Sequence, residues 1–362
     1  MGGGTAGHVS PLLAVAEALA ELTVVELRFI GGRRGLEGDL ARTAGIRFHA
    51  IPLPSLRDPD SRVALLTHLL LVPIATIDAL AQLIRWRPNV VLTSGSFSSL
   101  PVLLATRLLH IPIYLWVGDA IPGRALRAVA GWSSGIGLTF EPARNAMPRG
   151  RATVTGNPVR KSLLRWTKAE GRRALGLDPA VPVVLVTGGS QGSEKINAAI
   201  ASALSRLVRH ATVVHHTGPA NVEKAQAQRA LLGEADRGRY QPHGYLHDEM
   251  GAALAAADLV VGRAGSSSIA EPLAFGVPLV LIPFGAAMNA HQAANARATA
   301  ELGAAVILPE SDLDGDRLAA VIAGLLDDPA RLARMAANAK AAGRPAAAEQ
   351  IARAVLALGG CA

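Results

Sequence analysis

The stretch from Gly262 to Ala296 limits what this chain can fold into more than any other part of it. An apolar run, 257–261, leads into the stretch, and a second run, Leu279–Ile282, lies inside it. Short runs of this kind are typical of strands buried on both faces of a parallel sheet. A turn of glycine and serine follows the first run and opens a helix, and Pro283 ends the second run. The pattern therefore predicts an α/β fold in which two neighbouring strands send their following loops to one crevice.

The polar residues of this stretch lie after those two runs. They are the hydroxyl of Ser268, the carboxylate of Glu271 and the amides of Gln292 and Asn295. This set suits the hydroxyls of a sugar or ribose better than a metal ion or a nucleophilic triad. Each residue also has a plain structural interpretation: Glu271 as an early-helix acid favoured by the helix dipole, and Gln292 as a solvated loop residue. Their occurrence together favours a binding site.

Composition narrows the class of protein. The chain has 362 residues, half of them hydrophobic, which is enough for two domains with their own cores. The single cysteine, Cys361, excludes a disulfide framework and a cysteine zinc site, so a reducing cytoplasm is expected. The net charge of +8 fits phosphorylated substrates or an anionic membrane surface. Nucleic acid ranks last, because no nucleic-acid-binding motif is found and aromatic residues make up only 4%.

The order of strand, glycine turn and helix occurs in both halves. In the second half the apolar run Val183–Val186 precedes the turn 187–193, which is neither a P-loop nor a GxGxxG motif. Such a turn at a helix N-terminus offers backbone amides to a phosphate. We therefore expect two doubly wound parallel-sheet domains, 1–160 and 161–340, facing a central cleft. A C-terminal helix within 341–362 is expected to pack back toward the first domain.

The glycine turn of the first half, within Met1–Pro11, lacks the strand that should come before it. No apolar run precedes Gly2 in the sequence, although a turn of this kind normally follows a strand. We therefore expect either that the start has been placed too far downstream or that the sheet lacks a strand that would normally be central. A misplaced start codon is the favoured explanation.

Two side chains of the first half are candidates for acid–base chemistry. His8 lies in the glycine turn, where a neutral imidazole can accept a proton near pH 7. Asp119 follows the strand-like run Ile113–Val117 and should face the same crevice. The alternatives are a histidine that only caps the next helix and an aspartate that only shapes a turn before glycine and proline.

The most apolar segment is Arg62–Arg87, which Pro73 and Asp78 interrupt. Its longest uncharged run is too short or too broken to predict a membrane span. A well-buried pair of helices is the favoured interpretation. The alternative is that one face lies on a membrane, with the group 85–87 (Arg-Trp-Arg) at the level of the headgroups.

Six segments, taken in order and covering essentially the whole chain, resemble the MurG family of bacterial glycosyltransferases. They are GGGTAGHVSP at 2–11, FIGGRRGLE at 29–37, TGNPVR at 155–160, VTGGSQGS at 186–193, RAGSSSIAE at 263–271 and HQAANA at 291–296. The resemblance implies the GT-B architecture of two Rossmann-like domains. It also implies an inverting transfer of N-acetylglucosamine from UDP-N-acetylglucosamine to the muramyl 4-hydroxyl of lipid I, the undecaprenyl-diphosphate-linked muramyl pentapeptide, giving lipid II for peptidoglycan synthesis.

The resemblance assigns roles by matched position. On the acceptor side it implies Thr5, Gly7, Phe97 and Asp119, with His8 as general base. On the donor side it implies Ser190, Gln191, Gly192 and Ser268 at the nucleotide and diphosphate, Glu271 on the ribose, Leu246 at the uracil through its backbone, Gln292 on the sugar, Asn295 beneath that loop, and Arg160. The family uses neither a metal nor a cofactor in this reaction, and no acidic metal-binding cluster is visible. The implied location is peripheral, on the cytoplasmic face of the cell membrane, with an anionic membrane surface as a partner and no nucleic acid.

The chain departs from the family pattern mainly in its first half. Asp119 stands where an acceptor-site asparagine is expected, so it is a second candidate for the base. Phe97 replaces a tyrosine of a glycine-rich segment, and His291 stands where many members have another polar residue. Donor identity is therefore better supported than acceptor identity. Three alternatives stay open: a UDP-sugar transferase with a different lipid or natural-product acceptor, a non-catalytic UDP-sugar-binding protein, and a UDP-N-acetylglucosamine epimerase.

Overall fold

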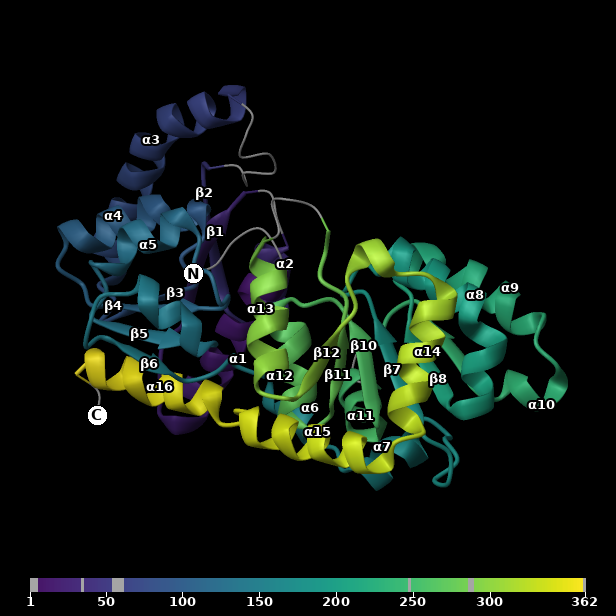
Figure 1. The fold of residues 1–362 in the computed structure, drawn as a ribbon. Helices are drawn as coiled ribbons and strands as arrows, with labels where there is room; N and C mark the ends of the chain where they lie inside the picture. The colour runs from purple at the N-terminus through teal and green to yellow at the C-terminus, as the bar shows by residue number, and fades with distance from the viewer. Residues whose placement is uncertain (1–5, 34–35, 54–61, 247–248, 286–289, 361–362) are drawn as a thin grey trace. The chain divides into compact units, whose positions relative to one another are not determined.

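The computed structural model describes residues 6–33, 36–53, 62–246, 249–285 and 290–360. The chain divides into two units. The first unit comprises Met1–Arg160 together with Pro345–Ala362, and the second comprises Lys161–Arg344. Both units alternate strands and helices, as expected for parallel α/β domains (Figure 1).

The second unit contains one six-stranded sheet in the order β12-β11-β10-β7-β8-β9, and every neighbouring pair is parallel. The central strands are buried because their residues are apolar on both faces. From β7 the chain passes first to β8 and later to β10 on the opposite side, which creates a topological switch point. The strands are β7 (Val183–Thr187), β8 (Thr212–His216), β9 (Tyr240–His243), β10 (Leu259–Gly262), β11 (Leu279–Leu281) and β12 (Ala305–Ile307).

Ten α-helices of the described chain belong to this unit. They are α6 (Lys161–Leu164), α7 (Lys168–Ala174), α8 (Glu194–His210), α9 (Val222–Ala230), α10 (Glu234–Arg237), α11 (Glu249–Ala256), α12 (Ser266–Ala274), α13 (Ala290–Glu301), α14 (Gly315–Leu326) and α15 (Pro329–Ala342). A large apolar cluster joins β7, β8 and β10 to one face of α8 and α14. The parallel sheet predicted from the two apolar runs is confirmed.

The first unit has its strands in two separate sheets. One is the parallel pair of β1 (Arg28–Gly32) and β2 (Arg47–Ile51). The other is parallel in the order β3-β4-β5-β6, made of β3 (Val91–Thr93), β4 (Ile113–Val117), β5 (Gly135–Leu138) and β6 (Ala152–Val154). Among the residues that the structure describes, no strand joins β1 to β3.

The helices of the first unit cover both faces of these strands. They are α1 (Ala6–Leu22), α2 (Glu37–Thr43), α3 (Arg62–Trp86), α4 (Leu100–Leu108), α5 (Arg124–Ala130) and α16 (Ala347–Leu358). Tyr114 and Trp116 of β4 pack with α1 and α16, which lie side by side, whereas Leu115 packs with α5. Successive residues of a strand point to opposite faces, so α1 and α16 cover one face and α4 and α5 the other.

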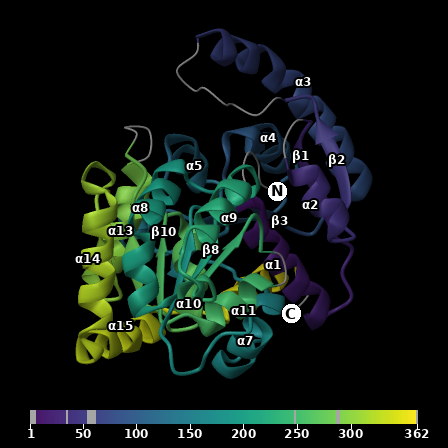
Figure 2. The same ribbon diagram turned by 90° about the vertical axis from the view of Figure 1, so that its right-hand side faces the viewer.

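Two local expectations need correction. The expected helix pair in Arg62–Arg87 is one continuous helix, α3, with Pro73 inside it. Its buried face, which includes Ala75, Ala79 and Leu83, packs on the core around β1, β2 and α4. This packing outweighs the proline penalty. Figure 2 shows α3 next to β2. Likewise α1 begins at Ala6, so His8 lies in the first helical turn and not in a loop. None of the described helices is long and apolar enough to cross a bilayer.

Candidate functional site

A glycine loop at the centre of the second sheet forms one wall of the candidate site. It spans 188–192 between β7 and α8, and Gly189 and Gly192 have φ values of +86° and +76°. A Cβ on Gly192 would lie 1.9 Å from the carbonyl oxygen of Thr217, and one on Gly188 would lie 2.3 Å from the Ser193 nitrogen. These positions therefore require glycine. The loop leads directly into the 17-residue helix α8, and the free backbone amides at the N-terminus of this helix favour binding of an anion.

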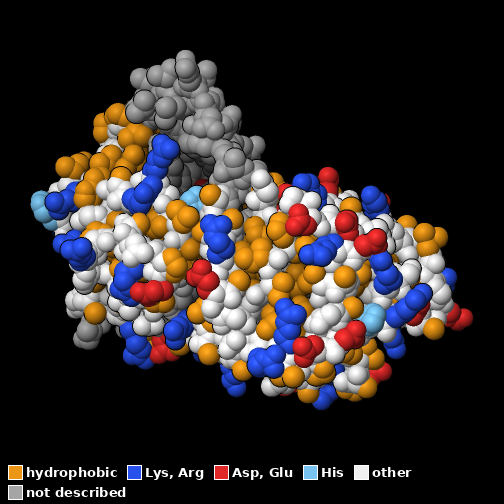
Figure 3. All heavy atoms as spheres, in the orientation of Figure 1, with side chains coloured by type: hydrophobic (Ala, Val, Ile, Leu, Met, Phe, Trp, Pro, Cys, Tyr) orange, Lys and Arg blue, Asp and Glu red, His pale blue; other side chains and the backbone are white. Residues whose placement is uncertain are grey.

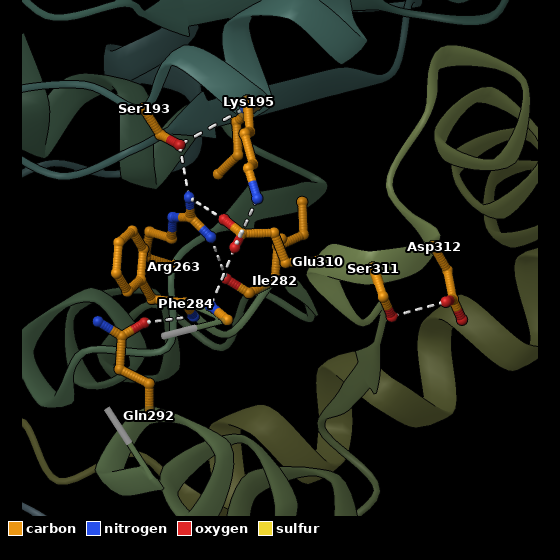
Figure 4. Close-up of polar contacts among 11 residues, drawn as sticks. Ser193, Lys195, Arg263, Ile282, Phe284, Gln292, Glu310, Ser311 and Asp312 are labelled. Carbon is orange, nitrogen blue, oxygen red and sulfur yellow. Dashed lines mark hydrogen bonds and ion pairs between the residues drawn. The ribbon is translucent and has the colours of Figure 1, made fainter. Parts of the chain in front are cut away.

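A buried ion pair forms the base of the site (Figure 4). Arg263, directly after β10, has its Nη2 2.6 Å from Glu310 Oε1, and their side chains are only 9% and 6% exposed. The same Nη2 donates to Ser193 Oγ at 2.8 Å, and Nη1 donates to the Ile282 carbonyl at 3.3 Å. The guanidinium also lies over the Phe284 ring, 5.0 Å from its centroid. Arg263 thus links the loop after β7, the end of β10 and the loop after β11.

Glu310, which follows β12, completes this network. Its Oε2 accepts from the backbone nitrogen of Gly285 at 3.0 Å and from Lys195 Nζ at 3.1 Å. Burial alone would raise the pKa of Glu310, but the hydrogen bonds from Arg263, Lys195 and Gly285 together lower it. The carboxylate therefore stays charged and holds three loops in place. We name Arg263, Glu310, Lys195 and Ser193 the Arg263 network.

A cavity of about 720 Å³ lies above this network. The glycine loop, Lys195, Phe284 and Gln292 line it. Gln292, in the first turn of α13, accepts from the Phe284 backbone nitrogen through its Oε1 at 3.1 Å. This bond fixes the amide so that its nitrogen is the group available for a ligand. The size of the cavity and the few polar side chains on its wall, such as Lys195 and Gln292, suit a sugar nucleotide.

Asn295 has a structural position one turn further along α13. It is fully buried, and its Nδ2 donates to the Ala264 carbonyl at 3.1 Å. It thereby ties α13 to the turn between β10 and α12. Ser268 and Glu271, both half-buried, lie on α12 directly after that turn.

The other predicted donor residues follow β7 and β9. Ser190 is half-buried and Gln191 is exposed in the glycine loop, while Leu246, shortly after β9, has a buried side chain. A backbone contact is thus the one that Leu246 can offer. The structure brings the loops after β7, β10 and β11 to the same edge of one sheet, as the sequence predicts, because parallel strands end at a common edge.

A buried histidine network joins β8 to its neighbours α8 and β9. His215 Nε2 lies 3.0 Å from Asn197 Oδ1, and its Nδ1 lies 2.9 Å from the Tyr240 hydroxyl. Asn197 Nδ2 donates to the Thr217 carbonyl, so Oδ1 is the acceptor and the proton of His215 resides on Nε2. Burial lowers the pKa of His215 to about 3, with a smaller effect from His216. The histidine is therefore neutral and structural.

The predicted acceptor residues lie in the first unit. His8 is half-buried in the first turn of α1, where Gly7 is exposed, and Asp119 is half-buried in the bend after β4. Thr5 lies outside the described residues, as does the side chain of Phe97 in the turn before α4. Arg160 is exposed at the end of the first unit.

Sequence reasoning missed the Arg263 network. Arg263 and Glu310 are 47 residues apart, so only the fold brings them together; an arginine directly after a fully apolar strand was the one available signal. Within the described chain, no group of three or more histidine, cysteine, aspartate or glutamate side chains could hold a metal ion.

Comparisons with known proteins place the chain in a family. Residues 1–136 match the glycosyltransferase family 28 N-terminal domain, and 183–351 match the corresponding C-terminal domain. A UDP-N-acetylglucosamine--N-acetylmuramyl-(pentapeptide) pyrophosphoryl-undecaprenol N-acetylglucosamine transferase from Moorella thermoacetica is 37% identical over 98% of this chain and 97% of its own. The protein of the same name from Desulforudis audaxviator is 35% identical over 97% and 95%.

A solved structure agrees with the fold. The crystal structure of Acinetobacter baumannii MurG matches with a TM-score of 0.76 over 98% of this chain and 97% of its own, at 24% identity. The two parallel-sheet units therefore have the GT-B fold that the sequence predicts. Together with the sequence matches, this establishes that the chain belongs to the MurG family of glycosyltransferases.

Proposed function

We propose that the protein transfers N-acetylglucosamine from UDP-N-acetylglucosamine to the muramyl 4-hydroxyl of undecaprenyl-diphosphate-linked muramyl pentapeptide. The observation that carries the proposal is the cavity above the Arg263 network. It combines an amide-rich glycine loop at a long helix N-terminus with the amide of Gln292, and relatives at 35–37% identity are named for this transfer.

Donor binding follows from the chemistry of the cavity wall. The backbone amides of the glycine loop, Ser190 and the N-terminus of α8 meet the diphosphate, and Ser268 at the start of α12 adds a second helix N-terminus. Glu271 accepts from the ribose hydroxyls, and the backbone at Leu246 contacts the uracil. Gln292 donates to a hydroxyl of the sugar. Arg160 and Gln191 complete the donor contacts.

The reaction is a single displacement at the anomeric carbon. The muramyl 4-oxygen attacks C1 and loses its proton to a base, while the bond from C1 to the diphosphate oxygen breaks and UDP leaves with the electron pair. The configuration at C1 therefore inverts. Fixed amides and the dipole of α8 stabilise the charge that develops on the leaving diphosphate.

We assign the base to His8, with Asp119 as the alternative. His8→Ala should lower kcat about 100- to 10,000-fold, since this is the usual contribution of a general base, while calorimetric affinity for UDP stays unchanged. Asp119→Asn is the matched variant, because it restores the amide expected at that position. Full turnover by His8→Ala with a large loss in Asp119→Asn would move the role to Asp119.

The acceptor is tested by comparing candidate acceptors in separate reactions. Purified protein is given radiolabelled UDP-N-acetylglucosamine with lipid I in one reaction, and with undecaprenyl phosphate or simple lipid alcohols in the others. We expect label only in the lipid I product. Transfer to a simple lipid alcohol alone would favour a transferase with a different acceptor, and label that stays in a nucleotide-bound epimer would indicate an epimerase.

Membrane contact is the remaining part of the proposal. Three isoleucines of α3, Ile74, Ile77 and Ile84, are 56%, 69% and 53% exposed and share one helix face by their spacing. Leu108 of α4 is 64% exposed, and Figure 3 shows hydrophobic side chains over α3 and α4. These side chains form a larger exposed apolar surface than a single isolated residue does, and such a surface suits contact with the cytoplasmic surface of a membrane. An Ile74→Ser, Ile77→Ser variant should sediment less with anionic vesicles and keep its affinity for UDP; unchanged sedimentation would contradict this.

A further inference from the structure

Two cations line the cavity above the Arg263 network, and they are held very differently. The side chain of Arg263 is 9% exposed, and its guanidinium bonds the Ser193 hydroxyl and the Glu310 carboxylate. The side chain of Lys195 is 65% exposed, and its Nζ lies 3.1 Å from Glu310 Oε2 (Figure 4). Arg263 is therefore fixed as part of the fold, whereas the ammonium of Lys195 is in water and can turn toward a ligand in the cavity.

Glu310 keeps its other partners when Lys195 turns away. Its Oε1 lies 2.6 Å from Arg263 Nη2, and its Oε2 accepts from the Gly285 nitrogen at 3.0 Å. These two groups neutralise and hold the carboxylate, whose side chain is 6% exposed. An ion pair with a solvated ammonium adds little to stability, because water and salt screen it. Releasing Lys195 from Glu310 is therefore cheap in free energy.

The charges on the cavity wall show why this lysine matters. Among the described residues that line the cavity, four are charged: Arg263, Glu310, Glu194 and Lys195. Arg263 and Glu310 form a buried pair and cancel each other. The other two are neighbours in the first turn of α8, and both are exposed. Without Lys195, the Glu194 carboxylate would leave the wall with a net negative charge, which disfavours an anion beside the glycine loop.

The position of Lys195 selects one part of the donor. The cavity that it lines is also lined by Gly188 and Gly192 of the loop proposed for the diphosphate, and by Gln292, which is proposed for the sugar. Leu246, proposed for the uracil, is not among the residues that line it. The β-phosphate is the phosphate bonded to the sugar. A cation on this wall therefore faces the β-phosphate and not the α-phosphate next to the nucleoside.

We propose that Lys195 is a catalytic residue that binds the β-phosphate of the donor and stabilises it as the leaving group. When the bond between C1 and the β-phosphate oxygen breaks, the electron pair stays on that oxygen, so the diphosphate gains one negative charge. The ammonium turns from Glu310 to this phosphate and donates a hydrogen bond without giving up its proton. The inference rests on the function proposed above, and it adds a side-chain cation to the backbone amides of the loop.

The first test compares UDP with UMP, which lacks the β-phosphate, by isothermal titration calorimetry. Lys195→Met should weaken UDP binding about tenfold and change UMP binding less than about twofold, since a charge-assisted hydrogen bond is lost only with UDP. Lys195→Arg should recover most of the lost affinity. Glu194→Gln should act in the opposite direction and strengthen UDP binding about two- to fivefold. A lysine that only holds Glu310 in place predicts no such gain from Glu194→Gln.

Lys168→Met is the matched control within the same unit. Lys168 also pairs with a carboxylate, that of Asp258, and its side chain is 56% exposed. Asp258 accepts from the nitrogen of Val183, the first residue of β7. This pair therefore lies at the edge of the sheet opposite the glycine loop, which follows the last residue of β7. Lys168→Met should bind UDP and UMP as the unchanged protein does.

The second test measures turnover with saturating UDP-N-acetylglucosamine and lipid I. Lys195→Met should lower kcat about 10- to 100-fold, because the charge on the leaving oxygen is largest in the transition state, and Lys168→Met should keep kcat. The proposal is overturned if Lys195→Met keeps the original ratio of UDP to UMP affinity, or if it keeps kcat. A protein that binds no UDP before any substitution would instead overturn the proposed function, and this inference with it.

Discussion

In the second unit β7 leads directly into the glycine loop 188–192, whereas in the first unit no described strand leads into α1. Both units nevertheless use parallel strands covered by helices on both faces. In the second unit the central strand places its loop between β8 and β10, and the Arg263 network can join the loops of three strands. The comparison teaches that the Arg263 network depends on one continuous sheet, because that sheet brings the loops after β7, β10 and β11 to a common edge.

The largest effect should come from breaking the buried pair of the second unit. Glu310→Gln leaves the charge of Arg263 buried without its partner, and this costs about 3–5 kcal/mol. The matched control is Glu349→Gln in the first unit. Glu349 bonds Arg353 at 2.7 Å, but both side chains are more than half exposed, so the cost is about 0.3–0.5 kcal/mol. Equal urea midpoints for the two variants would contradict the special role of the Arg263 network.

The next effect concerns the glycine loop. Gly192→Ala forces a Cβ against the Thr217 carbonyl at a φ of +76°, so we expect a loss of about 3 kcal/mol and no measurable UDP binding. Gly45→Ala in the first unit is the control, because Gly45 has a φ of +72° and open space around it. Its cost should be about 1 kcal/mol. If both variants bind UDP equally well, the loop does not form the site.

A smaller loss of stability is expected at acid pH, and this loss should be confined to the second unit. Its buried His215 has a folded pKa of about 3 against an unfolded value of 6.5, and burial also lowers the pKa of His216 and of His243. The unfolded chain therefore binds protons more readily than the folded chain. The contribution of these neutral histidines to the free energy of unfolding is full above pH 6.5 and is lost as the pH falls below it. Lowering the pH to 5 should cost about 2 kcal/mol for His215 alone.

Hydrogen exchange at pH 7 and pH 5, corrected for intrinsic rates, measures this loss in each unit. Peptides of β7 and β8 should lose protection at pH 5, whereas those of β4 should change little. A His215→Gln variant should show a smaller difference between the two pH values. Equal acid sensitivity in both units would show that the histidine network is not its cause.

The sequence predicted the fold wherever local pattern and tertiary structure agree. The runs at β7, β10 and β11 are apolar because both faces of the sheet are covered. The glycines of the loop after β7 occur where other backbone atoms come too close for a side chain. The expected break at Pro73 was wrong because packing of Ala75 and Ala79 on the core continues the helix through it. The periodicity of the sequence alone does not show whether the packing energy of the helix is larger than the cost of a proline inside it.

The candidate site was predicted only in part. Ser268, Glu271 and Gln292 lie on segments that directly follow strands, so their common edge follows from parallel topology. Arg263 and Glu310 form their contact only in the folded sheet, and Asn295 is tied to Ala264 inside it.

The most direct test of the account follows the sugar itself. The protein is incubated with UDP-N-acetylglucosamine labelled in the sugar and with lipid I in detergent, and the lipid extract and free UDP are quantified together. The account predicts one labelled lipid-linked disaccharide, β-linked at the new bond, for each UDP released. Release of UDP with free N-acetylglucosamine, or retention of all label in the nucleotide, would contradict it.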